Sequence, residues 1–75
     1  MRSPAAFGSL ESLRDGNRRR VVEALRRHGT ASRAEIARVT GLSRSTVSSL
    51  VGELQSTGLV VERPNGVGRG PQQGL

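Results

Sequence analysis

Two short segments with helical spacing, joined by three residues that begin with a glycine, constrain the fold of this chain more than any other feature. They span residues 33–40 and 44–57, with Gly41 between them. Ser32 followed three residues later by Glu35 is a capping box, in which two side chains satisfy backbone amides that have no partner inside the helix. Gly41 allows a tight turn with positive φ. The pattern therefore predicts two short helices that cross closely at a sharp turn.

The second of these helices is expected to have two different faces. At about 100° per residue, one side collects the aliphatic side chains of an expected buried stripe, which are Val47, Leu50, Val51 and Leu54. The opposite side carries only small uncharged residues, which are Ser45, Ser49, Gly52 and Ser56, with Ser48 at the edge. A helix that only faces water more often carries Glu and Lys there. Small residues instead suit a helix whose backbone comes close to base edges.

The segment before these two helices also has a helical pattern, which begins at Ser9 and stops at Gly29. It is either one continuous helix or a short turn followed by a helix from about Asn17. Asp15 and Gly16 favour the second alternative, because Asp is a good N-cap and Gly weakens a helix interior. We therefore expect a break at this point.

A short β-type run, Leu59–Arg63, follows the third helix and ends at Pro64. The glycines at 66, 68 and 70 predict a flexible loop, after which Gln72–Leu75 returns as a second strand. Three helices followed by a hairpin are the element order of a winged helix-turn-helix, a mainly α fold with a small β-hairpin.

The chain has 75 residues, which is enough for one small domain. We expect residues 1–8 to form a flexible N-terminal arm and residues 9–63 to form the winged core, with the helix-turn-helix at 32–57. Residues 64–75 are expected to form the wing loop and the start of a linker to a further C-terminal domain.

The charge balance points to a polyanionic partner. There are 12 basic residues, all of them Arg, against six acidic ones, for a net charge of +6. Such an excess on a short chain is typical of nucleic-acid binding. The single aromatic residue, Phe7, argues against single-strand binding, which stacks bases on aromatic side chains. Double-stranded DNA is therefore the expected partner.

Several other functions find no support in the sequence. There is no Cys, and His28 is the only His, so no metal-ligand set and no cofactor site are expected. The six acids are scattered and His28 has no nucleophile in register, so the chain is not expected to be an enzyme. No apolar run is long enough for a membrane span or a signal peptide. We expect a cytoplasmic protein, associated with the nucleoid.

The third helix is expected to enter the major groove and contact bases from its first turns. Arg44 is the one long donor there that can reach a guanine or a phosphate. Arg33 either is simply exposed or contacts a phosphate at a helix N-terminus. Arg18 is expected at the edge of the core, from which it can reach a phosphate. The other candidates are small hydroxyl residues, namely Ser43 (first of all a helix cap), Ser45, Thr46, Ser48 and Ser49.

Beyond these patterns, the chain from about Leu10 to Val61 resembles the N-terminal domain of ROK-type transcriptional repressors. The all-Arg basic composition resembles that of a high-GC bacterium such as an actinomycete. The resemblance rests on the runs Asn17-Arg18-Arg19, Ser32 to Ala37, Thr40 to Ser48, Glu53-Leu54 and Gly58 to Val60, with a looser match in the Gly-Arg-Gly-Pro of residues 68–71.

This resemblance implies a sugar-responsive repressor of carbohydrate metabolism, with a domain of sugar-kinase type beyond Leu75. It also implies that the wing approaches the minor groove, where Arg69 would read groove width. Repressors of this type bind a pseudo-palindromic operator as homodimers or higher oligomers. The present chain shows no heptad or spare apolar patch, so we expect it to be monomeric by itself. The family's wing continues into a returning strand, for which residues 71–74 are a weak match.

Three alternatives remain open at the level of sequence. The chain could be the winged helix of another regulator class, such as the MarR-like or DeoR-like groups, which the helical core barely separates. It could be a protein-interaction winged helix that uses its basic face on an acidic partner. It could also bind DNA as an architectural protein, with equal affinity for all duplexes.

Overall fold

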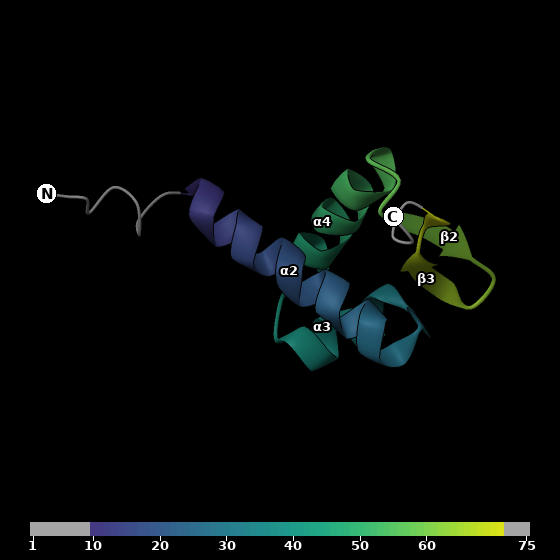
Figure 1. Ribbon diagram of the computed structural model, residues 1–75. Coiled ribbons are helices and arrows are strands. Elements are labelled where there is room, and N and C mark those ends of the chain that lie inside the picture. The colour runs from purple at the N-terminus through teal and green to yellow at the C-terminus, as the bar shows by residue number, and fades with distance from the viewer. Residues whose placement is uncertain (1–9, 72–75) are drawn as a thin grey trace, which may run out of the picture.

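The computed structural model describes residues 10–71, which form three helices and a small sheet (Figure 1). The elements in chain order are α2 (Leu10–His28), β1 (Thr30–Ala31), α3 (Arg33–Thr40), α4 (Arg44–Ser56), β2 (Val60–Arg63) and β3 (Gly66–Arg69). This is the predicted winged helix-turn-helix, a mainly α fold with an antiparallel hairpin. The expected arm at residues 1–8 and the strand expected at Gln72–Leu75 lie outside the described residues.

Helix α2 runs without interruption through Asp15 and Gly16, so the predicted break is wrong. The Asp15 carboxylate forms an ion pair with Arg18 one turn later instead of capping a new helix. Arg14 and Arg18 also reach Glu53 on α4 and attach this half of the helix to the domain. Arg14 and Arg18 stand on either side of Gly16, where a glycine in the helix interior costs about 1 kcal/mol.

The two helices of the central unit begin and end where their caps predict. The Oγ of Ser32 accepts a hydrogen bond from the backbone N–H of Glu35 at 3.1 Å. The Oγ of Ser43 does the same for Thr46, also at 3.1 Å. Gly41 has a φ of 78°, the left-handed conformation that the turn requires. Local capping therefore determines this part of the fold.

A single aliphatic core lies between the helices and the sheet. The four residues of the expected α4 stripe are all buried in it, and Leu42 packs against it from the turn. Ile36 of α3 is fully buried as well. The buried cluster consists of Val21, Leu25, Ala31, Ile36, Val47, Leu50, Val51, Leu54, Val60 and Val67.

The glycine-rich segment is a strand rather than the flexible loop predicted for it. The sheet has three strands in the order β1-β3-β2, with both pairings antiparallel. Arg63 stands opposite Gly66, so the hairpin turns at Pro64 and Asn65. The two-residue strand β1, which the sequence analysis missed, pairs with the other edge of β3.

Two glycines, one at the start of β3 and one directly after it, pack closely against neighbouring backbone. Gly66 has a φ of 140°, and a Cβ there would overlap the backbone carbonyl of Ala31. A Cβ on Gly70 would overlap the carbonyl of Gly58 in the same way. At these two positions the backbone lies nearer to its neighbours than a side chain would permit. Close approach of another backbone is a common reason for glycine in or beside a strand.

Candidate nucleic-acid interface

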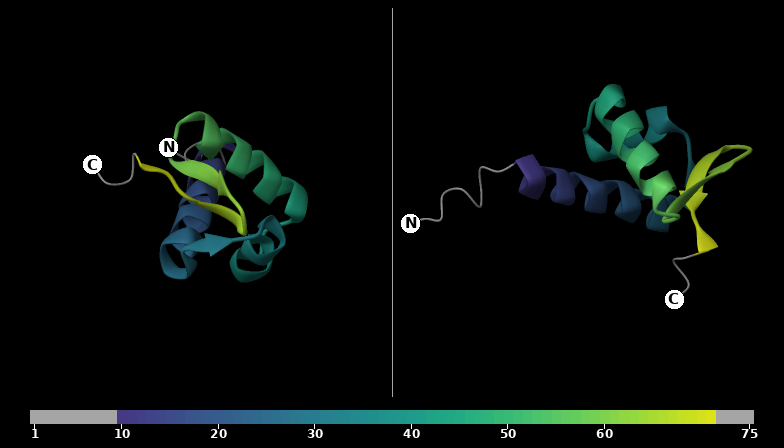
Figure 2. Two further views of the ribbon diagram at one scale, coloured as in Figure 1. Left: turned by 90° about the vertical axis from the view of Figure 1, so that its right-hand side faces the viewer. Right: turned by 90° about the horizontal axis from the view of Figure 1, so that it is seen from above.

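The side of α4 that faces away from the core is a surface of small polar residues. Five residues with short or absent side chains are exposed along it, which are Ser45, Ser48, Ser49, Gly52 and Ser56. We call these five residues the serine face. Seen from above in Figure 2, the turn of the hairpin lies on the same side of α2 as α4 does. The serine face and the hairpin turn can therefore approach one surface together.

Arg44 begins α4 and is exposed beside the serine face. Its guanidinium makes no hydrogen bond or ion pair with any residue in the described range, so its donors are available to an incoming partner. Ser43 is less available, because its hydroxyl both caps α4 and donates to the Oγ1 of Thr46 at 2.8 Å. Thr46, which accepts that hydrogen bond, is itself half-buried.

Two arginines of α2 bind the carboxylate of Glu53 on α4. The Nε of Arg14 donates to Glu53 at 2.6 Å and the Nε of Arg18 donates to the same carboxylate at 2.8 Å. The hydrogen bond from Arg18, and after it the hydrogen bond from Arg14, hold the pKa of Glu53 below its usual range. The hydrogen bond that Arg18 donates to Glu53 raises the pKa of Arg18 in return. Arg18, predicted as a phosphate contact, is thus engaged inside the domain.

Arg14 is a residue that the sequence analysis missed. Its Nη2 donates to the Oγ of Ser49, on the serine face, at 2.9 Å. The signal that could have found it is the four-residue spacing to Arg18, which places both side chains on one face of a helix. The spacing has this meaning only in a continuous helix. Because a break was expected at Asp15, Arg14 and Arg18 were not expected to lie on one helix face.

Arg33 is tied to the hairpin. Its Nη1 and Nη2 each lie 3.3 Å from one oxygen of Glu62 on β2. The Nε2 of Gln55 on α4 donates to the same carboxylate at 2.7 Å. The hydrogen bonds from Arg33 and then from Gln55 lower the pKa of Glu62. A single carboxylate therefore joins the start of α3, the second half of α4 and the hairpin.

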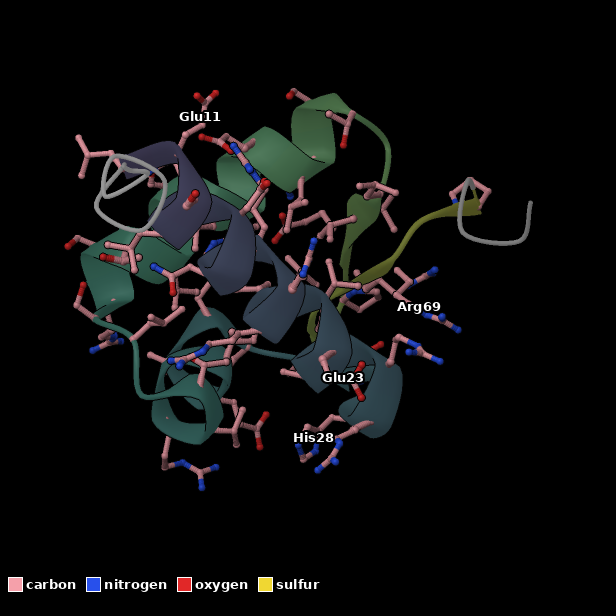
Figure 3. The ribbon with its side chains drawn as sticks, turned by 60° about the vertical axis from the view of Figure 1, so that its left-hand side comes forward. Glu11, Glu23, His28 and Arg69 are labelled. Atoms are coloured by element: carbon pink, nitrogen blue, oxygen red, sulfur yellow. The ribbon has the colours of Figure 1, made fainter. Side chains whose placement is uncertain are left out.

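Arg69 ends strand β3 and does not lie in the flexible loop that the sequence predicts. It pairs with Val60 at the base of the hairpin, three residues from Gly66. In Figure 3 its side chain leaves the end of β3 on the side of the molecule that carries Glu23 and His28 of α2. The basic residue next to the turn is Arg63, another residue that was missed. Its Nη2 donates to the backbone carbonyl of Arg69 at 3.0 Å.

The ion pairs divide the arginines of residues 10–71 into two sets. Six of them form salt bridges with carboxylates, namely Arg14, Arg18, Arg26, Arg27, Arg33 and Arg38. The others have no carboxylate partner within this range, and these are Arg19, Arg20, Arg44, Arg63 and Arg69. Arg44 and Arg63 from this second set lie at the start of α4 and beside the hairpin turn. Positive charge without a carboxylate partner within residues 10–71 therefore lies at the start of the serine face and beside the hairpin turn.

Two further properties of the described region bear on other kinds of site. Its His, Asp and Glu side chains nowhere gather in a group of three that could hold a metal ion. None of its helices is long and apolar enough to cross a membrane. A groove of about 530 Å³ lies between the second half of α2 and the end of α3, and it is open to solvent.

Comparison with known proteins agrees with this geometry. The family model described as MarR family matches residues 15–70, which is well over half of the chain and extends from the first half of α2 to the end of the hairpin. The search of curated proteins and the search of solved structures each found no match.

Proposed function

Because the chain belongs to the MarR family of winged-helix transcription regulators, we propose that it binds double-stranded DNA and recognises its sequence. In this proposal α4 enters the major groove and the β2–β3 hairpin lies near the minor groove. A regulator of this kind acts on the bacterial chromosome, so its place is the cytoplasm, at the nucleoid. Transcription regulation requires no catalysis by the winged helix itself.

The observation that carries the proposal is the serine face with the free guanidinium of Arg44 at its start. A helix fits the major groove of B-DNA, and short side chains let its backbone approach the base edges. Ser and Thr hydroxyls accept several base edges, whereas an Arg fork selects guanine. The major-groove contacts are assigned to Arg44, Ser45, Thr46, Ser48 and Ser49.

Residues around the serine face would contact the DNA backbone. Arg33 is the first residue of α3 and Ser43 is the N-cap of α4, and at both helix starts the dipole attracts a phosphate. We assign the hairpin contact to Arg63 because it stands next to the turn, while Arg69 stands at the base. Arg18 acts indirectly, by holding Glu53 and so the orientation of α4.

The resemblance to ROK-type repressors supports a narrower proposal. The matching runs lie in α2, α3, α4 and the start of β2, so they concern the DNA-binding unit. We propose that this unit belongs to a sugar-responsive repressor that binds a pseudo-palindromic operator as a dimer, with dimerisation supplied outside residues 10–71. A sugar that changes the operator affinity of the full-length protein supports this narrower proposal. Operator binding that no sugar changes contradicts it.

The general proposal is tested by selection from a randomised duplex pool with the 75-residue chain at about 100 mM salt. We expect a half-site to be enriched, and we expect Arg44→Ala to lose that enrichment. Arg19→Ala is the matched control, because Arg19 also lacks a carboxylate partner within the described range but lies on α2. Binding that is salt-sensitive but enriches no sequence would indicate an architectural protein. Absence of binding would favour a protein partner instead.

A further inference from the structure

The Glu62 carboxylate lies against Arg33 in the position that a phosphate oxygen pair would take. Both terminal nitrogens of Arg33 donate to it, one to each oxygen, at 3.3 Å. Arginine binds carboxylates and phosphates through the same two parallel hydrogen bonds. The two kinds of anion therefore compete for one guanidinium.

Arg33 is also the place on α3 where a phosphate is most favoured. It is the first residue of that helix, and the helix dipole adds positive potential there. The Ser32 side chain caps one of the first backbone N–H groups of α3, that of Glu35. Charge at Arg33 and dipole at the helix start thus attract the same ligand.

The contact between Arg33 and Glu62 is easily exchanged. Its nitrogen–oxygen distances of 3.3 Å exceed the roughly 2.7–2.9 Å of a strong charge-assisted hydrogen bond. The side chains of Arg33 and Glu62 are 37% and 60% exposed, and pairs this exposed hold only weakly. Displacing the carboxylate from Arg33 therefore costs little free energy. After displacement, its negative charge remains close to the phosphate that replaces it.

We propose that Glu62 acts as an internal competitor for the DNA backbone, occupying Arg33 until a phosphate displaces it. This rests on the proposed function and adds a residue that sets affinity. The carboxylate weakens the sequence-independent part of binding, because every duplex has phosphates. A selected operator and a random duplex are therefore weakened by the same factor.

A purely structural role for Glu62 predicts the opposite sign. The carboxylate also accepts from Gln55 and so links the hairpin to α4. If its main effect were to hold the hairpin in place, its loss would loosen the hairpin and weaken DNA binding. The substitution Glu62→Gln separates the two roles, because the new amide keeps an oxygen for Gln55 and removes the charge.

The test is a duplex titration at several salt concentrations. We expect Glu62→Gln to bind both a random and a selected duplex about fivefold more tightly. Its slope of log affinity against log salt should steepen by up to about 0.9, because in the wild-type chain the displaced carboxylate stays beside the phosphate and offsets the counterion release that Arg33 causes. Glu23→Gln changes net charge equally, and within residues 10–71 the Glu23 carboxylate pairs only with Arg26 and Arg27 on α2. This control should gain less than twofold and keep the wild-type slope.

A second substitution shows whether the effect passes through Arg33. Arg33→Gln should weaken binding, and adding Glu62→Gln to it should restore almost nothing. The proposal is overturned if Glu62→Gln binds no better than Glu23→Gln, or if its gain survives in the double variant. If the wild-type chain shows no salt-sensitive binding to any duplex, the proposed function itself fails and the competition falls with it.

Discussion

The guanidinium of Arg14 donates a hydrogen bond to the Oγ of Ser49 across 2.9 Å, so a residue of the first helix takes part in the exposed surface of α4. The same guanidinium donates to Glu53 one turn further along α4. The orientation of the serine face is thereby coupled to α2, a helix that has no place in the proposed interface itself. Interface substitutions alone would not reveal this coupling.

Arg14→Ala should weaken binding of a selected duplex several-fold and leave the fold nearly unchanged. The contacts it loses are exposed, and pairs of this type contribute about 0–1 kcal/mol to stability. Duplex titration and thermal unfolding measure the two effects separately. Arg26→Ala, which removes an exposed pair with Glu23 on the same helix, is the control. Equal binding by both variants would show that Arg14 does not position α4.

Gly16→Ala should stabilise the protein by about 0.5–1 kcal/mol. Gly16 lies inside the continuous helix α2, and a Cβ there meets no atom within 4 Å. Alanine favours the helix over glycine by roughly this amount. Urea unfolding gives the free energy directly. A helix broken at Asp15 and Gly16 would instead gain nothing from the substitution.

Gly66→Ala should destabilise the protein by several kcal/mol, on the order of 3. The φ of 140° is strained for any L side chain, and the new Cβ would overlap the carbonyl of Ala31. The backbone strain acts at the first residue of β3, and the overlap acts on the contact between β3 and β1. We expect a large fall in the midpoint of urea unfolding. A change below about 1 kcal/mol would mean that the segment is the flexible loop expected from the sequence.

Stability should fall in acid, because arginines hold the pKa values of Glu53 and Glu62 below their usual range. A carboxyl with a lowered folded-state pKa stabilises the fold above its unfolded pKa of about 4.3, and that stability is lost as the pH falls through the folded pKa. The melting temperature should therefore be level from about pH 7 to 5 and fall below about pH 4.

Glu53→Gln identifies the source of that acid dependence. The variant should melt at a lower temperature at pH 7 and lose less stability on going to acid. Glu11→Gln controls for the change in net charge, since Glu11 forms no ion pair within residues 10–71. An acid dependence that is the same in wild-type protein and in Glu53→Gln would show that the Arg14 and Arg18 contacts do not stabilise the fold.

Sequence reasoning succeeded where the determinants are local. Ser32, Gly41 and Ser43 act within four residues of themselves, through caps and a left-handed turn. The aliphatic stripe of α4 follows from helical periodicity, and all four of its residues are buried. Such features depend on neighbouring residues alone, so they can be predicted without knowledge of the rest of the fold.

Tertiary structure decided the features that depend on residues far apart in sequence. Arg14 and Glu53 are separated by 39 positions, yet their contact attaches the first half of α2 to α4 at a place where local propensity favours a break. Gly66 is in a strand because its backbone lies against Ala31, which no local pattern reveals. The sequence by itself determined a helix-turn-helix with a serine face and a positive charge. Only the tertiary structure decided which arginines lack a carboxylate partner within residues 10–71. The physical reason is that an ion pair forms between groups that are close in space, whatever their separation in sequence.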